Sequence, residues 1–120
     1  TLTGDVTTAS NGTVGNDLTV AGTSTLKGDV FSKSNVTIDK DLTVKGTTNF
    51  LGDINIDKDL TIGGSQTVKG DSTIHGSQQI GKDLHVAGTT QLDGNILMNS
   101  NAIVQQNLGV GGNAEIMGDL

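Results

Sequence analysis

One pattern of six residues recurs along the whole chain of 120 residues and restricts what it can fold into. Residues 41–46 show it as Asp-Leu-Thr-Val-Lys-Gly. We number each hexad from the residue that is a multiple of six, so Leu42 holds position one and Val44 holds position three. Position three is apolar at 18 of its 20 occurrences, position one is apolar at 13 of 20, and neither ever carries a charge. The aliphatic residues are therefore confined to two fixed positions.

Positions one to three of each hexad have the pattern of a very short β-strand. Two apolar residues flank an outward residue, which is the period of two expected of a strand. Position five holds twelve of the eighteen Gly residues, and position six is Asp or Asn at fifteen places and Ser or Thr at the other five. Such residues form turns, because Gly readily adopts positive φ and short polar side chains bond nearby backbone.

Three strands and three corners make a triangle, so the sequence predicts an all-β fold, a triangular β-helix built from hexapeptide repeats. An α-helix is excluded, because a period of two cannot place both apolar sets on one helix face. Residues 1–120 are expected to form a single β-helical repeat domain that is a piece of a longer array. Two stretches, around residues 8–12 and 99–106, depart from the pattern and are expected to form looser or bulged coils.

Composition and charge exclude several classes of function. The net charge is −6 and the seven Lys residues are scattered without interleaved aromatic residues, so we expect no nucleic-acid partner. Cysteine is absent, which excludes thiolate sites and disulfides. No apolar run approaches the length needed to span a bilayer, and we expect no membrane insertion.

The position of each residue within its hexad, which we call the hexad phase, predicts the core residues and two polar residues among them. Ten aliphatic residues at positions one and three represent the predicted core: Leu18, Val20, Leu42, Val44, Leu60, Ile62, Leu84, Val86, Leu108 and Val110. Gln66 and Gln78 also fall at position one and are candidate internal polar layers, since buried amides must find hydrogen-bond partners. The alternative is that these two side chains bend out at a corner and reach solvent.

No catalytic, cofactor or metal site is predicted, and the chain is not expected to be an enzyme. His75 and His85 occupy outward positions and should be solvated. The Asp residues at position six suggest calcium, but corner hydrogen bonding explains them without a metal. Outward Thr residues at position two suggest an ice-binding face, although only residues 1–3 place Thr on both sides of an inward residue. Thr is better explained as a β-branched strand former.

The hexads are compatible with one chain or three chains in each coil. In a single-chain coil every third hexad stacks on one face, and sorting the position-one residues in this way gives no face a character of its own. We therefore expect three chains interwound into a homotrimer, in which each layer contains the same hexad of each chain. At about 4.8 Å between strands, the threefold rod would be roughly 96 Å long and the single-chain rod roughly 32 Å.

The hexads resemble the shaft repeats of bacteriophage tail fibres and of the fibre proteins of some large viruses. Residues 41–48, Asp-Leu-Thr-Val-Lys-Gly-Thr-Thr, followed by Gly-Asp-Ile at 52–54, carry the resemblance, which covers essentially the whole chain. It implies a trimeric shaft in the virion that adjoins other fibre domains and holds a receptor-binding tip away from the particle. It carries over no catalytic residues.

A second resemblance is to the left-handed parallel β-helix of hexapeptide acyltransferases. Residues 80–84, Ile-Gly-Lys-Asp-Leu, are close to that repeat. That family generally has a small residue at position one and a catalytic His on a loop. Here Leu or Ile often stands at position one and no insertion interrupts the hexads. The alternative to a fibre shaft is thus a single-chain β-helix, either acyltransferase-like or with an ice-binding or ligand-binding surface.

Overall fold

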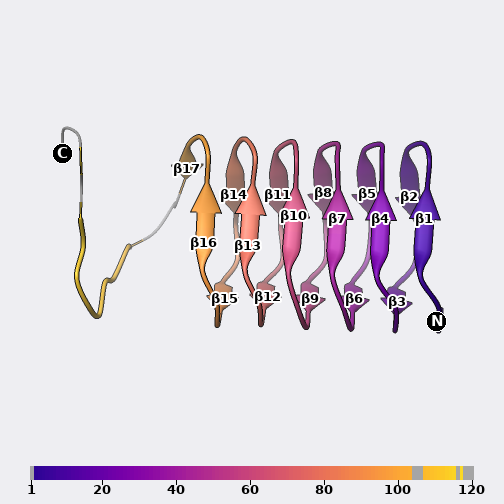
Figure 1. The fold of residues 1–120 in the computed structure, drawn as a ribbon, viewed down its shortest axis with the longest axis horizontal. Helices are drawn as coiled ribbons and strands as arrows, with labels where there is room; N and C mark the ends of the chain where they lie inside the picture. The colour runs from indigo at the N-terminus through magenta and orange to yellow at the C-terminus, as the bar shows by residue number, and fades with distance from the viewer. Residues whose placement is uncertain (1, 104–106, 116, 118–120) are drawn as a thin grey trace.

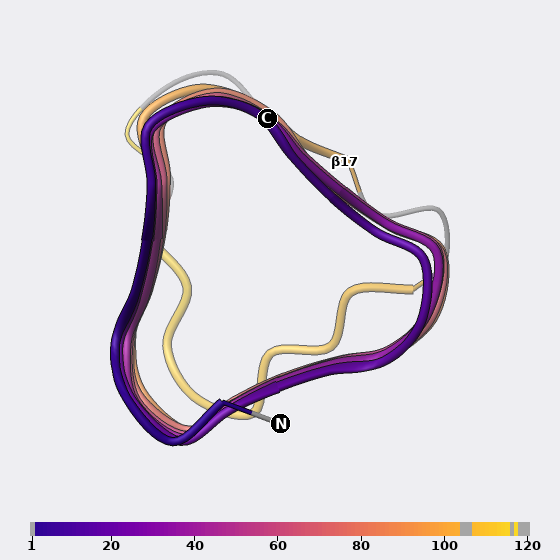
Figure 2. The same cartoon turned by 90° about the vertical axis from the view of Figure 1, so that its right-hand side faces the viewer.

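The computed structural model describes residues 2–103, 107–115 and 117. The described chain is a parallel β-solenoid with seventeen short strands in three sheets, and it contains no helix (Figure 1). Viewed along the axis, successive coils superpose on a rounded triangle (Figure 2). The predicted all-β fold built from hexad strands is confirmed.

Each sheet takes every third strand of the chain. The first sheet contains β1 (Val6–Thr8), β4 (Ser24–Leu26), β7 (Leu42–Val44), β10 (Leu60–Ile62), β13 (Gln78–Ile80) and β16 (Ile96–Met98). The second sheet contains β2 (Gly12–Val14), β5 (Val30–Ser32), β8 (Thr48–Phe50), β11 (Gln66–Val68), β14 (Leu84–Val86) and β17 (Ala102–Ile103). The third sheet contains β3 (Leu18–Val20), β6 (Val36–Ile38), β9 (Ile54–Ile56), β12 (Ser72–Ile74) and β15 (Thr90–Leu92).

All strand pairs are parallel and share one register. Leu60 pairs with Leu42 below it and with Gln78 above it, so each residue lies beside the residue 18 positions away. Backbone bonds continue this ladder into the corners: the Leu42 amide donates to the Asp59 carbonyl at 3.0 Å, and the Lys45 amide to the Leu26 carbonyl at 2.9 Å. One chain supplies all three sides of every coil, and its overall extents are 44 × 23 × 20 Å.

The burial of the side chains follows the hexad phase. In most strands from β4 to β13 the first and third residues are buried and the middle residue is partly or fully exposed. Sixteen buried aliphatic or aromatic residues form one core cluster along the axis, and Phe50 is the largest of them. Because both inward positions of every strand meet the same interior, a chain with few aromatic residues still buries a continuous apolar core.

Eight of the ten predicted core residues lie in or against this cluster. Val20, Leu42, Val44, Leu60, Ile62 and Leu84 are buried, and Leu18 and Val86 pack against them with partial exposure. The prediction is wrong for Leu108 and Val110, whose side chains are 79% and 53% exposed. These two residues follow β17, and residues 107–115 form no strand, so no closed coil surrounds them.

The expected irregularity near the start of the chain takes the form of a void. β1 and β2 keep the common register, with Thr8 beside Leu26 and Gly12 beside Val30. Because Gly12 and Ser24 are small inward residues, the interior beside them retains a cavity of about 40 Å³. In the second expected stretch, β17 has only two residues, and residues 104–106 lie outside the described chain.

The structure corrects our expectation that Gly is needed in the corners for its positive φ. No described residue, Gly included, has a positive φ. The glycines are instead required where successive coils approach closely. A Cβ atom at Gly88 would lie 2.5 Å from the Gly70 carbonyl oxygen, and one at Gly28 would lie 2.7 Å from the Asn11 amide nitrogen. Stacked corners at strand spacing leave no room for a side chain at these points.

Candidate functional site

The most repetitive polar feature is a ladder of hydrogen bonds between the corners of successive coils. The side chain at position six accepts from the backbone amide of the residue 18 positions later, as Asp29 Oδ1 does from Thr47 at 2.8 Å and Asp59 Oδ1 from Ser77 at 2.8 Å. With Asp or Asn as acceptor the distances are 2.8–3.1 Å. The Thr47 and Ser65 hydroxyls accept similar bonds at 3.4 Å.

This ladder explains the Asp and Asn residues at position six without a metal. We expected their side chains to bond the nearby backbone of the same turn, but the partner is the next coil. The described residues contain no group of three acidic, His or Cys side chains that could hold a metal ion. The corner side chains are therefore structural groups that tie each coil to the one before it.

Three buried polar side chains belong to consecutive strands of one coil. β11, β12 and β13 are consecutive strands on three different sheets, and their first residues are Gln66, Ser72 and Gln78. Each of these side chains is 1% exposed, so neither amide bends out to solvent. Gln78 Nε2 donates to Gln66 Oε1 at 2.6 Å.

The polar groups of this coil, which we call the polar coil, do not all have hydrogen-bond partners. Gln66 Nε2, Gln78 Oε1 and Ser72 Oγ are buried and have no hydrogen-bond partner. The Ser24 and Thr48 hydroxyls, also at position one, are in the same state. A buried polar group without a partner costs about 1–3 kcal/mol, so these positions weaken the core relative to aliphatic residues.

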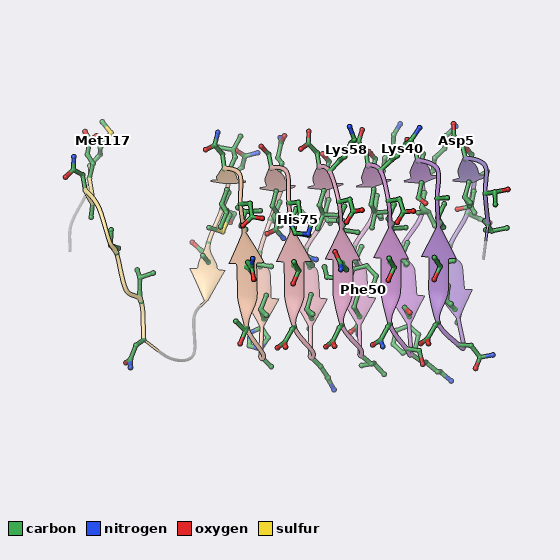
Figure 3. The ribbon with its side chains drawn as sticks, turned by 90° about the horizontal axis from the view of Figure 1, so that it is seen from below. Asp5, Lys40, Phe50, Lys58, His75 and Met117 are labelled. Atoms are coloured by element: carbon green, nitrogen blue, oxygen red, sulfur yellow. The ribbon has the colours of Figure 1, made fainter. Side chains whose placement is uncertain are left out.

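His75 and His85 lie at outward positions, as the hexad phase predicts. His75 Nδ1 lies 2.8 Å from Asp93 Oδ2, one coil further along, and the two side chains are 45% and 52% exposed. The hydrogen bond from His75, with a smaller contribution from Gln91, lowers the pKa of Asp93 from its ordinary value. Figure 3 shows His75 together with Asp5, Lys40 and Lys58 in the same view of the side chains. The two side chains are about half exposed and lie on adjacent coils, which is the geometry of a surface ion pair.

A hollow beside Phe31, in the part of the chain that the structure describes, is a possible binding feature that was not predicted from the sequence. Phe31 is the middle residue of β5 and stands between Thr13 and Asn49 on the outer face of the second sheet. Asp29 and Thr47, from the adjoining corner, also line the hollow, which has a volume of about 290 Å³. The hexad phase does place Phe31 at outward position two, and an outward aromatic residue was the available signal.

Comparison of the chain with protein-family models, with curated proteins and with solved structures found no match in any of the three. Within the part of the chain that the structure describes, no helix is long and apolar enough to cross a membrane.

Proposed function

We propose that this chain is part of the structural shaft of a phage or virus fibre, which holds a receptor-binding tip away from the particle. The observation that carries the proposal is the uninterrupted coil. Seventeen strands follow one another at six-residue intervals, and each corner is only three residues long. The described corners therefore include no long loop of the kind that commonly carries catalytic residues. In this proposal the chain acts as a spacer between adjoining fibre domains rather than as an enzyme.

Repeated bonding along the axis suits this role. From β1 to β15, each coil is joined to the next through three parallel strand pairs and through corner hydrogen bonds such as that from the Asp71 amide to Asp53 Oδ1 at 2.8 Å. In a solenoid, stability is roughly a sum over repeats and their nearest-neighbour interfaces. A shaft can thus be lengthened by whole coils without a change in its cross-section.

Immunogold electron microscopy tests the location. An antibody raised against this chain should label fibres on intact particles of the source virus, between the particle surface and the fibre tip. Particles whose fibres carry no label would overturn the proposal. The acyltransferase alternative predicts a different result, namely turnover of acyl-CoA donors that is lost in His75→Ala or His85→Ala.

The proposal extends to a homotrimer, supported by the incomplete pairing of the polar coil. In the single-chain coil Gln66 Nε2 and Gln78 Oε1 are buried without partners. In threefold layers the same Gln from each of three chains would face the axis, and a ring of three amides lets each donate to the next. Buried amides favour the arrangement that satisfies them.

Engineered disulfides distinguish the two arrangements, because the chain has no Cys of its own. In the single-chain coil residue 43 lies beside residue 61 of the same chain. In the interwound trimer residue 43 would lie beside residue 49 of a neighbouring chain. Directly paired parallel residues are about 4.8 Å apart, within disulfide range.

The threefold arrangement predicts covalent oligomers from Thr43→Cys with Asn49→Cys and a sedimentation mass three times the chain mass of 12.2 kDa. An intramolecular disulfide from Thr43→Cys with Thr61→Cys, together with the mass of one chain, would exclude the trimer. That result would leave the shaft itself as a single-chain solenoid.

A further inference from the structure

Phe31 is the only aromatic side chain on the outside of the described solenoid. The chain has two Phe and no Trp or Tyr, and the other Phe, Phe50, is 1% exposed in the core. Phe31 is partly exposed, and its neighbours in the column are the smaller Thr13 and Asn49. The ring is therefore flanked along its column by two shorter polar side chains.

The hollow beside this ring is lined by both hydrogen-bond donors and acceptors. Asn11 Oδ1 accepts from the Asp29 amide at 2.9 Å, which leaves the Asn11 side-chain NH₂ as a donor. Asp29 Oδ1 accepts from the Thr47 amide, and the carboxylate has a second oxygen that can also accept. Asn49 Oδ1 is covered and has no partner. Thr13 adds a hydroxyl that can donate and accept.

The local charge does not favour an ion. Asp29 is the only charged residue that lines the hollow, and Lys27 and Lys45 occupy neighbouring positions of the same column of corners. An anion would meet the Asp29 carboxylate, and the positive charges of the two Lys residues on the same column of corners offset the attraction of that single carboxylate for a cation. The ligand that suits the hollow is neutral, has many hydroxyl groups and presents one apolar face.

We propose that this hollow is a binding site for a single neutral pyranose, free or as one residue of a glycan. A pyranose has a face of C–H bonds that packs flat on an aromatic ring, which supplies large contact area at low entropic cost. Its hydroxyls both donate and accept, as the Asp29, Asn11 and Thr13 side chains require. The volume of about 290 Å³ lies at the lower end of small-molecule sites and fits one sugar ring.

The inference depends on the coil being formed by one chain, because only then do Thr13, Phe31 and Asn49 lie in adjacent coils. It does not depend on the chain belonging to a virus fibre. Failure of the particle-labelling experiment would leave it intact. A threefold mass with covalent oligomers through residues 43 and 49 would overturn it while the shaft proposal stood.

Heteronuclear NMR titration tests the site on the full chain. The probes are the methyl glycosides of glucose, galactose, mannose and N-acetylglucosamine, each added to about 100 mM, well above a millimolar dissociation constant. Tetramethylammonium chloride serves as the probe for a cation. At least one glycoside should shift the amide signals of residues 11–13, 29–31 and 47–49 and leave the other coils unchanged.

Three variants complete the test. Phe31→Ala should weaken the response at least tenfold, Phe31→Tyr should keep it, and Thr37→Ala, at the same hexad position on another sheet, should not change it. The backbone spectra of the variants outside the hollow report that the solenoid is folded. No shift with any glycoside, shifts that survive Phe31→Ala, or a response to tetramethylammonium alone would each overturn the assignment.

Discussion

Gln78 Nε2 donates a hydrogen bond to Gln66 Oε1 at 2.6 Å in the interior of the solenoid, across twelve residues of sequence. The two side chains come from neighbouring sides of the same coil, and each leaves one polar atom without a partner. Such a pair differs from the residues that precede and follow it at the same hexad position, Leu60 and Leu84, which are aliphatic. The pair therefore adds little to the stability of the fold. Its main effect is to make this coil different from the others, as a polar core residue that fixes register does.

Replacing both glutamines should be less harmful than replacing either one. Gln66→Leu alone leaves the Gln78 amide buried with no partner, which costs about 1–3 kcal/mol. Gln66→Leu with Gln78→Leu removes both amides and adds apolar burial, so the double variant should unfold at a higher urea concentration than either single variant and than the parent chain. Urea denaturation of the four proteins gives the coupling directly. A double variant that unfolds well below both singles would show the amides to be essential partners in the fold.

Charge at inward positions should be far more destabilising than charge at the adjacent outward positions. Ile62 is 1% exposed, whereas Thr61 points outward from the same strand. Ile62→Asp buries an unpaired carboxylate and should cost several kcal/mol, while Thr61→Asp should stay within about 0.5 kcal/mol. Val86→Asp and Ala87→Asp form a second pair with a smaller difference, because Val86 is only partly buried. Equal shifts in thermal unfolding for inner and outer sites would contradict the hexad phase.

Two glycine-to-alanine substitutions should distinguish the steric cost of a Cβ atom between stacked corners from the effect of Ala on the entropy of the unfolded chain. A Cβ atom at Gly88 would meet the Gly70 carbonyl oxygen at 2.5 Å, whereas one at Gly109 meets nothing within 4 Å. Gly88→Ala should therefore force the corners apart and cost more than about 1 kcal/mol. Gly109→Ala should be neutral or slightly stabilising, because Ala reduces the entropy of the unfolded chain. Chemical denaturation measures both, and a harmless Gly88→Ala would refute the close-approach explanation.

The hydrogen bond between His75 and Asp93 predicts that the stability of the fold depends slightly on pH under acidic conditions. The pKa of Asp93 is lowered in the folded chain, chiefly by the hydrogen bond from His75. A lowered carboxyl pKa contributes stability above the unfolded value, 3.8 for this residue, and that stability is lost as the pH falls through the folded value. In His75→Ala the Asp93 pKa should rise toward 3.8, as measured by carbon NMR of the carboxyl group. His75→Gln, which can donate a similar bond, should retain part of the depression, and an Asp93 titration unchanged in both variants would contradict this assignment.

The hexad pattern alone determined where the strands lie and which way their side chains face. Every strand from β1 to β16 begins at a multiple of six, because two inward residues separated by one outward residue fix both the extent and the face of a three-residue strand. The inward placement of Ile62 and Gln66 and the outward placement of His75 follow from the same local rule.

Only the tertiary structure decided which residues meet. The partner of each strand lies 18 residues away, because three hexads of one chain close each coil, whereas the hexad pattern is also compatible with coils shared by three chains. For this reason the local pattern could not predict three contacts. These are the hydrogen bond from the Thr47 amide to Asp29, the approach of the Gly70 backbone to Gly88, and the hydrogen bond between Gln66 and Gln78. Leu108 keeps the hexad phase yet is exposed, because burial requires a closed coil around a residue as well as the right position within its hexad.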